Sequence, residues 1–298
     1  MVNAKEIKAR IKSVQDTRKI TNAMYMIAST KMRKAKKDLD RTRPYFNTLY
    51  NEMECIFKSV DHIESRYIHS DMESEEKKSA YGILVITADK GLAGSYNKNV
   101  IKEAERLISE YDNTKLFVVG ESGRRYFTQR RQRVEKSFLY TAQNPSLDRA
   151  KEISSLLLDL YDIGELDEIY IIYSDLKNSL TTNVRAKRLL PFQRTHYYTL
   201  QEDEQGLFDF FPSVADVIES LVKSWLSGFI YSALVDSFCS EQSARMSAMY
   251  SANKNAEKIL ETLTIQYNLM RQASITQEIT EVTSSAKAQI KKRKKEVL

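Results

Sequence analysis

The amino-terminal part of the chain repeats apolar or small residues at alternating intervals of four and three, which is the spacing of a coiled-coil seam. Arg18 interrupts this series, whose members are Ile7, Ile11, Val14, Thr21, Tyr25, Ala28, Met32, Ala35 and Leu39. A second apolar stripe runs beside it through Ile20, Met24 and Ile27. Residues 3–43 contain neither Gly nor Pro, so the pattern predicts one long helix, with Pro44 as a point where it could kink.

The carboxyl-terminal part is also free of helix breakers, because no Gly or Pro occurs from Phe229 to Leu298. One continuous helix over this stretch would be roughly 100 Å long at 1.5 Å per residue. A helix of that length cannot bury one face inside its own domain, so it needs a partner helix or an enclosing protein. The simplest architecture pairs the two terminal helices in an antiparallel coiled coil.

Between these ends the rhythm changes to short apolar runs that alternate with helical segments. The runs read as buried strands, at 81–87, 115–120, 134–140, 168–176 and 184–192. Strands alternating with helices indicate a parallel or mixed sheet covered by helices. We therefore predict an α/β protein, in which a central Rossmann-like α/β domain joins the long antiparallel coiled coil of the terminal helices. Its expected parts are an N-terminal helix (1–60), a linker (61–80), the α/β domain (81–198), a connector (199–213) and a C-terminal helix with a basic extension (214–298).

Charge is unevenly distributed along the chain. Residues 1–43 hold thirteen Lys/Arg against four Asp/Glu, a net of +9, and residues 285–298 hold six against one, a net of +5. Because the whole chain totals +6, the residues between them carry about −8. Basic ends on an acidic body are compatible with solvated helix faces, with an acidic partner or with nucleic acid. The tail KKRKK lacks the interleaved aromatic residues of nucleic-acid binders, and lysines at a helix end also suit the helix dipole. We therefore expect no nucleic-acid partner.

The composition indicates a protein with reduced cysteines and at most a peripheral association with a membrane. No run of eighteen apolar residues occurs, so we expect no transmembrane helix and at most a peripheral membrane association. No signal-peptide or transit-peptide pattern precedes the first helix, which favours a bacterial cytoplasmic protein over a secreted or organellar one. Cys55 and Cys239 are far apart and read as reduced thiols.

The strongest candidate for chemistry is the turn ADKGLAGSYN, in which Gly91 and Gly94 follow a strand and precede a helix. Phosphate sites are built at such turns, but neither GxGxxG nor GxxxxGK[ST] is present, so we favour a structural turn. The histidines His62, His69 and His196 lack metal-ligand spacing, and no nucleophile or metal motif occurs. We predict no catalytic residue, no cofactor, no metal and no small-molecule substrate.

Four stretches resemble the gamma subunit of F-type ATP synthases. They are RIKSVQDTRKITNAMYMIASTKMRKAK near the amino end, TADKGLAGSYN after the first strand, and ALVDSFCSEQSARMSAMYSANKNA with YNLMRQASITQEITEV in the last helix. The matches are dense at both ends, whereas residues 115–198 match mainly in their α/β rhythm. Ala93 and Ser95 stand where the family turn often has cysteine and glycine, and the chain runs on past the point where many relatives end.

The resemblance implies the central-stalk rotor of a rotary ATP synthase, at the cytoplasmic face of the bacterial inner membrane. Its implied partners are the alpha and beta subunits of the catalytic hexamer, the epsilon subunit and the membrane rotor ring of c subunits. Catalysis would reside in the beta subunits, so this chain would be a non-catalytic subunit. Two other functions stay open at this point: a structural coiled-coil adaptor with a partner-binding α/β domain, and a basic nucleic-acid-binding protein.

The resemblance also implies contact or coupling roles for six residues, namely Met24, Arg245, Arg271, Gln272, Thr276 and Glu278. In the family these positions contact the hexamer or the partner helix. For each of them, packing within the coiled coil or pairing on the helix surface is the alternative.

Overall fold

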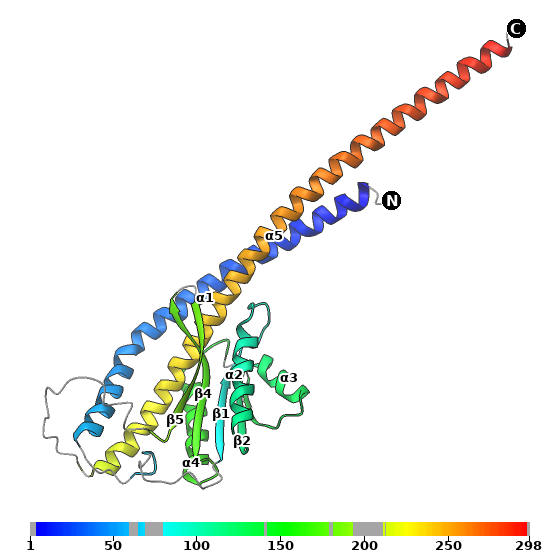
Figure 1. Ribbon diagram of the computed structural model, residues 1–298. Helices are drawn as coiled ribbons and strands as arrows, with labels where there is room; N and C mark the ends of the chain where they lie inside the picture. The colour runs from blue at the N-terminus through cyan, green and yellow to red at the C-terminus, as the bar shows by residue number, and fades with distance from the viewer. Residues whose placement is uncertain are drawn as a thin grey trace. The chain divides into compact units, whose positions relative to one another are not determined.

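The computed structural model describes residues 4–59, 65–68, 80–139, 142–178, 181–192, 211 and 213–296. It divides into two compact units, one made of Met1–Met26 and Ala248–Leu298, the other of Ile27–Ser247. The two longest helices each contribute to both units: α1 spans Ala4–Ser59 and α5 spans Val214–Glu296 (Figure 1). Both helices are continuous, as predicted for their breaker-free stretches, and they also continue through Pro44 in α1 and Gly228 in α5.

The larger unit is built on a five-stranded mixed sheet. In spatial order its strands are β3 (Val134–Phe138), β2 (Thr114–Val119), β1 (Tyr81–Ile86), β4 (Glu168–Asn178) and β5 (Thr181–Leu190). The pairs β1–β2, β2–β3 and β1–β4 are parallel, and β5 returns antiparallel to β4. The mixed sheet and its five strands are thus confirmed, but the last strand ends at Leu190 and not at Phe192, and Tyr140, the predicted end of the third strand, lies outside the described residues.

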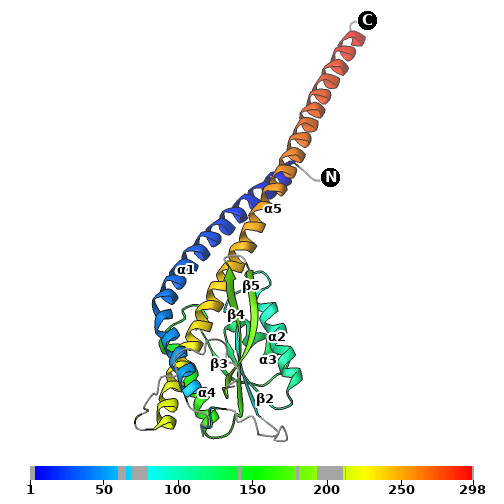
Figure 2. The same ribbon diagram turned by 60° about the vertical axis from the view of Figure 1, so that its left-hand side comes forward.

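Helices cover both faces of this sheet, so that its inner strands β1, β2 and β4 are buried on two sides. On one face lie α2 (Tyr96–Glu110) and α3 (Glu121–Gln129). On the other face lie α4 (Leu147–Asp162) and the part of α5 from Ile218 to Cys239 (Figure 1 and Figure 2). Because side chains alternate along a strand, Ile83 and Val85 of β1 enter the first core, whereas Leu84 and Ile86 enter the second. These inner strands read as unbroken apolar runs, which is why the sequence revealed them.

Within the larger unit, α1 and α5 approach each other closely where Gly228 of α5 faces Phe46 of α1. A Cβ at this position would lie 2.4 Å from a ring carbon of Phe46, so only a glycine allows the aromatic ring to pack there. The same ring lies 5.9 Å from that of Tyr231, one helical turn further on. Further along α5, Cys239 is a free buried thiol, and burial raises its pKa to about 12.

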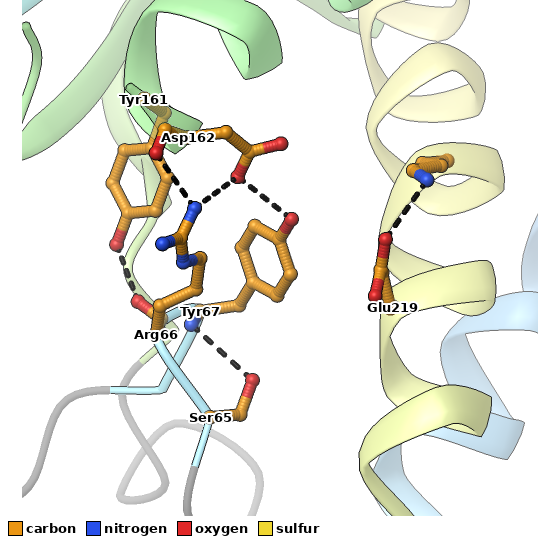
Figure 3. Close-up of polar contacts among 7 residues, drawn as sticks. Ser65, Arg66, Tyr67, Tyr161, Asp162 and Glu219 are labelled. Atoms are coloured by element: carbon orange, nitrogen blue, oxygen red, sulfur yellow. Dashed lines mark hydrogen bonds and ion pairs between the residues drawn. The ribbon is translucent and has the colours of Figure 1, made fainter. Parts of the chain in front are cut away.

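A short segment, Ser65–Ile68, is fastened to the carboxyl end of α4 (Figure 3). Arg66 Nη1 donates to the Asp162 carbonyl at 2.8 Å and to its Oδ1 at 3.1 Å, and the Tyr67 hydroxyl donates to the same Oδ1 at 2.8 Å. The Tyr161 hydroxyl donates in turn to the Arg66 carbonyl at 2.6 Å. Burial, together with the hydrogen bond to Asp162, raises the pKa of Tyr67 to about 12.

Candidate functional site

In the smaller unit α1 and α5 pair side by side in opposite directions. Thr21 Oγ1 donates to Asn253 Oδ1, and one turn away Arg18 Nη2 lies 3.3 Å from Glu257 Oε1. Residue numbers fall along α1 as they rise along α5, so the pair is antiparallel, as predicted. The ion pair also accounts for the interruption of the seam at Arg18, because this position meets a carboxylate instead of an apolar side chain.

The face of α5 that meets α1 follows a seven-residue repeat. Met249, Ala256 and Leu263 are buried, and Met270, the next member, is half-buried. The following steps of the repeat are Gln277 and Ser284, which are polar and exposed. The apolar seam of α5 therefore ends at about the level where α1 begins, and both views show α5 continuing past the amino end of α1 (Figure 1 and Figure 2).

Beyond this level every described side chain of α5 is exposed, from Arg271 to Lys287. We call this stretch the distal segment. Four of the residues singled out from the sequence lie within it, namely Arg271, Gln272, Thr276 and Glu278. An exposed apolar stripe runs along it at intervals of four and three, through Ile275, Ile279 and Val282. These positions do not continue the seam that faces α1, so the stripe is not part of the pairing with α1. The side chains beyond residue 287, including the basic tail, lie outside the described residues.

Met24 lies on α1 in the same unit and is half-buried. Its neighbours in the second apolar stripe, Ile20 and Ile27, are more than half exposed. The two stripes predicted for α1 therefore differ in environment. The seam residues Ile7, Ala28, Ala35 and Leu39 are buried, whereas the second stripe presents apolar atoms to the solvent.

Arg245 has a different setting, inside the larger unit. Its side chain is 10% exposed, and its Nη2 lies 2.6 Å from Glu241 Oε1, whose side chain is 7% exposed. The same nitrogen donates to the carbonyls of Lys90 at 3.3 Å and Gly91 at 3.1 Å. Burial raises the pKa of Glu241, and the charge of Arg245 opposes that shift. Arg245 thus joins α5 to the turn that contains Gly91 and Gly94, which we call the glycine turn. The four residues of the distal segment are instead exposed.

The glycine turn is held by side chains that the sequence analysis did not single out. The Ala88 amide donates to Asn97 Oδ1 at 2.9 Å, and the Glu121 amide at the start of α3 donates to Asp89 Oδ1 at 3.0 Å. Gly94 has a φ of 56°, in the left-handed region that favours glycine. Glu241 could have been found from its spacing of four residues before Arg245, which is a helical ion-pair spacing. Asp89 and Asn97 carry no comparable signal.

No group of three or more His, Cys, Asp or Glu side chains that could hold a metal ion occurs in the part of the chain that the structure describes. The three histidines lie outside that part. Among the described residues, no helix is both long and apolar enough to cross a membrane. The candidate functional features are therefore the exposed surfaces of the helix pair and the hydrogen bonds by which Arg245 joins α5 to the glycine turn.

Known proteins are similar in sequence to this chain along almost its whole length. The family model described as ATP synthase matches residues 3–289. The ATP synthase gamma chain of Caldanaerobacter subterraneus subsp. tengcongensis is 42% identical over 292 residues, which cover 95% of this chain and 98% of that protein. The gamma chain of Ruminiclostridium cellulolyticum is 40% identical, covering 96% and 98%. A gamma chain named as sodium ion specific, from Acetobacterium woodii, is 35% identical with the same coverage.

Solved structures agree with the fold. A chain from the central stalk and c-ring of the mitochondrial ATP synthase of Tetrahymena thermophila matches with a TM-score of 0.60 and 25% identity, covering 78% of this chain and 99% of that one. A rotor chain of the Euglena gracilis mitochondrial enzyme matches with a TM-score of 0.61 at 14% identity, covering 91% and 98%, and supports the fold alone. With the antiparallel terminal helices and the mixed sheet already established, these similarities show that the chain belongs to the ATP synthase gamma chain family.

Proposed function

We propose that this chain is the central-stalk rotor subunit of a rotary ATP synthase. It couples ion-driven rotation of a membrane ring of c subunits to ATP synthesis or hydrolysis in a hexamer of alpha and beta subunits, and the epsilon subunit joins it in the stalk. The observation that carries the proposal is the distal segment of α5, which is exposed on all sides over Arg271–Lys287 and has no partner helix among the described residues. A continuous helix that is exposed all round needs an enclosing partner, and the family supplies one.

A rotor has to resist twisting and bending, and the helix pair meets this requirement. Two uninterrupted helices wind together through a buried seam, so bending one of them requires deforming the other. The pair is also asymmetric, because α5 continues where α1 has ended. Rotation therefore presents a different surface in turn to each surrounding subunit, which changes the relative free energies of that subunit's conformations.

The distal segment has the surface chemistry of a weakly binding bearing. Its threonine hydroxyls are already bonded to carbonyls of the helix itself: Thr276 Oγ1 donates to Gln272 O at 2.9 Å, and Thr280 Oγ1 donates to Thr276 O at 2.8 Å. Thr283 Oγ1 donates to Ile279 O at 2.8 Å in the same way. These hydroxyls have little need of a partner's hydrogen bonds, so the segment presents methyl groups and scattered polar ends to its surroundings. Such a surface slides without being held at one angle.

Within this function the residues singled out from the sequence take different roles. Met24 and the exposed groups of the distal segment, Arg271, Gln272, Thr276 and Glu278, are proposed contacts with the hexamer. An exposed ion pair contributes at most about 1 kcal/mol, so torque has to arise from many contacts and from shape. Arg245 is a positioning residue, which fastens the glycine turn of Gly91 and Gly94 to α5 so that the body turns with the helix.

The chain would contribute no catalytic group, and ATP chemistry would reside in the beta subunits. The protein would lie at the cytoplasmic face of the bacterial inner membrane as a peripheral component. The match to the gamma chain family supports this function over a structural adaptor or a nucleic-acid binder, the two alternatives that the basic ends left open.

Reconstitution tests the proposal. Alpha and beta subunits of the same enzyme are mixed with the full chain, with a chain ending at Met270, or with no addition, and ATP hydrolysis and rotation are measured. The full chain is expected to restore hydrolysis and unidirectional rotation, and loss of the distal segment is expected to reduce the torque. The proposal is wrong if the full chain neither copurifies with alpha and beta subunits nor changes their activity. Salt-sensitive binding of DNA by the isolated chain, without assembly, would favour the nucleic-acid reading instead.

A further inference from the structure

A strongly basic surface lies on α3 and the turn that leads from it into β3. We call it the arginine surface, and its members are Arg124, Arg125, Arg130, Arg131 and Arg133. It belongs to the sheet face that α2 and α3 cover, away from the core in which α4, α5 and α1 pack (Figure 2). The proposed rotor function makes no use of this surface. It is also unexpected on charge alone, because the chain between its basic ends is acidic overall.

Carboxylates next to these arginines are too few to balance them. Glu121 Oε1 is shared between Arg124 Nη2 at 2.6 Å and Arg125 Nε at 2.7 Å, and these two partners lower the pKa of Glu121 to about 2. Glu105 Oε1 accepts both from Arg130 Nη1 at 2.7 Å and from the Tyr126 hydroxyl at 2.8 Å. The remaining acid, Glu135, lies 3.4 Å from Arg133, whose side chain is 88% exposed. Positive charge is therefore in excess and faces the solvent.

Arg131 occupies a backbone position that usually takes glycine. Its φ is 57°, its amide donates to Thr128 O at 3.1 Å, and the Gln132 amide donates to Phe127 O at 3.0 Å, which closes α3 with a Schellman motif. The end of α4 uses the same two bonds with Gly164 at the matching position, where φ is 78°. A left-handed conformation is sterically unfavourable for arginine. Arg131 also forms no ion pair with any residue that the structure describes. The sequence thus has a cation where the backbone favours glycine.

The strand next to the arginine surface, β3, is an edge strand. It pairs with β2 on one side, and among the described residues no strand pairs with its other side. Glu135 and Lys136 of β3 are exposed. An edge strand presents unpaired amide and carbonyl groups, to which an extended segment of another protein can add as a further strand.

We propose that the outer edge of β3 binds an acidic, extended polypeptide segment of a partner protein, held at its side chains by the arginine surface. Backbone hydrogen bonds to β3 would align the segment along the strand, and carboxylates of the partner would neutralise the excess positive charge of the arginine surface. A lipid surface fits less well, because the exposed residues of α3 include none of the Trp, Phe or Leu side chains that anchor a helix in a bilayer. The inference is independent of the rotor function, since it uses a face that the helix pair does not occupy.

The test measures binding of the full chain to a fluorescein-labelled ten-residue peptide in which glutamate alternates with threonine. A peptide with lysine in place of glutamate tests charge. A peptide with the same number of glutamates separated by Pro-Pro pairs tests strand pairing, because proline cannot donate to a sheet and the pairs remove amide donors on both sides of the added strand. The protein variants are Arg131→Gly alone and Arg131→Gly combined with Arg133→Gln. The control is Arg149→Gln, an exposed arginine of α4 that pairs with Glu152 at 3.1 Å.

We expect the double variant to bind the glutamate peptide about tenfold more weakly than the unaltered chain, with Arg149→Gln unchanged. The proline peptide should bind at least as weakly as the lysine peptide. Arg131→Gly relieves the left-handed strain, so it should unfold at a higher urea concentration while binding more weakly, which separates binding from folding. Equal binding by the double variant and the control would overturn the proposal. So would undiminished binding of the proline peptide, or tighter binding to phosphatidylglycerol vesicles than to the glutamate peptide.

Discussion

Removing the guanidinium of Arg245 should destabilise the larger unit severely. Arg245→Met keeps much of the side-chain length but leaves Glu241 buried without its partner at 2.6 Å. Breaking a buried pair by removing one partner costs about 3–5 kcal/mol, because the remaining charge is neither hydrated nor compensated. The lost donations to the Lys90 and Gly91 carbonyls add less, since Gly91 is exposed and its carbonyl can bind water.

The single tryptophan of the chain provides the assay. Trp225 is buried in the larger unit, on the same helix as Arg245, with its ring 4.8 Å from that of Phe192. Urea unfolding followed by its fluorescence therefore reports the free energy of unfolding of this unit. The matched control is Arg149→Met, an exposed pair whose loss should cost less than about 1 kcal/mol. Glu241→Gln combined with Arg245→Met should recover much of the loss, because it removes the buried charge.

The pH dependence supplies an independent check of the cause. Burial raises the pKa of Glu241 above its usual 4.5, and loss of Arg245 removes an influence that lowers it. An acid whose pKa is raised in the folded state favours folding below its unfolded pKa, and this contribution is lost as the pH rises through the folded pKa. The deficit of Arg245→Met should therefore shrink as the pH falls from 7 towards 4.5, and the double variant should lack this dependence. A deficit below about 1 kcal/mol at pH 7, or one that does not change with pH, would refute the assigned role of the pair.

Three further changes test other parts of the structure. Gly228→Ala should lower the urea midpoint by an amount equivalent to about 1–3 kcal/mol, because its Cβ would overlap the Phe46 ring, and Phe46→Leu should restore part of the loss. Tyr67→Phe should lower the free energy of unfolding by about 1 kcal/mol at neutral pH in the same assay, because the hydrogen bond to Asp162 is lost. The folded pKa of Tyr67 is raised to about 12, so the phenol favours folding below pH 10 and loses that effect as the pH rises through 12. Deleting Lys291–Leu298 should leave assembly and coupled ATP hydrolysis nearly unchanged, whereas a loss of coupling would show that the tail takes part in the mechanism.

The regular elements could be predicted because their signals are local. The interrupted seam of α1 and the absence of helix breakers after Gly228 are read directly from residue types and spacing. The inner strands β1, β2 and β4 are buried on both faces, so they appear as apolar runs without needing any knowledge of their neighbours. The mixed sheet followed from the alternation of these runs with helices. The order of its strands did not, because pairing joins residues far apart in the sequence.

The candidate site was predictable only in part, for the same reason. The sequence by itself determined that the chain ends form long helices and that no catalytic motif accompanies them, since both depend on composition and spacing. Only the tertiary structure separated Arg245, buried against the turn at Lys90 and Gly91, from Arg271 and its neighbours on an exposed helix, although the resemblance had placed them in one group. It also decided that the apolar seam of α5 ends where α1 begins. Burial depends on which segments meet in space, and no single stretch of sequence contains that information.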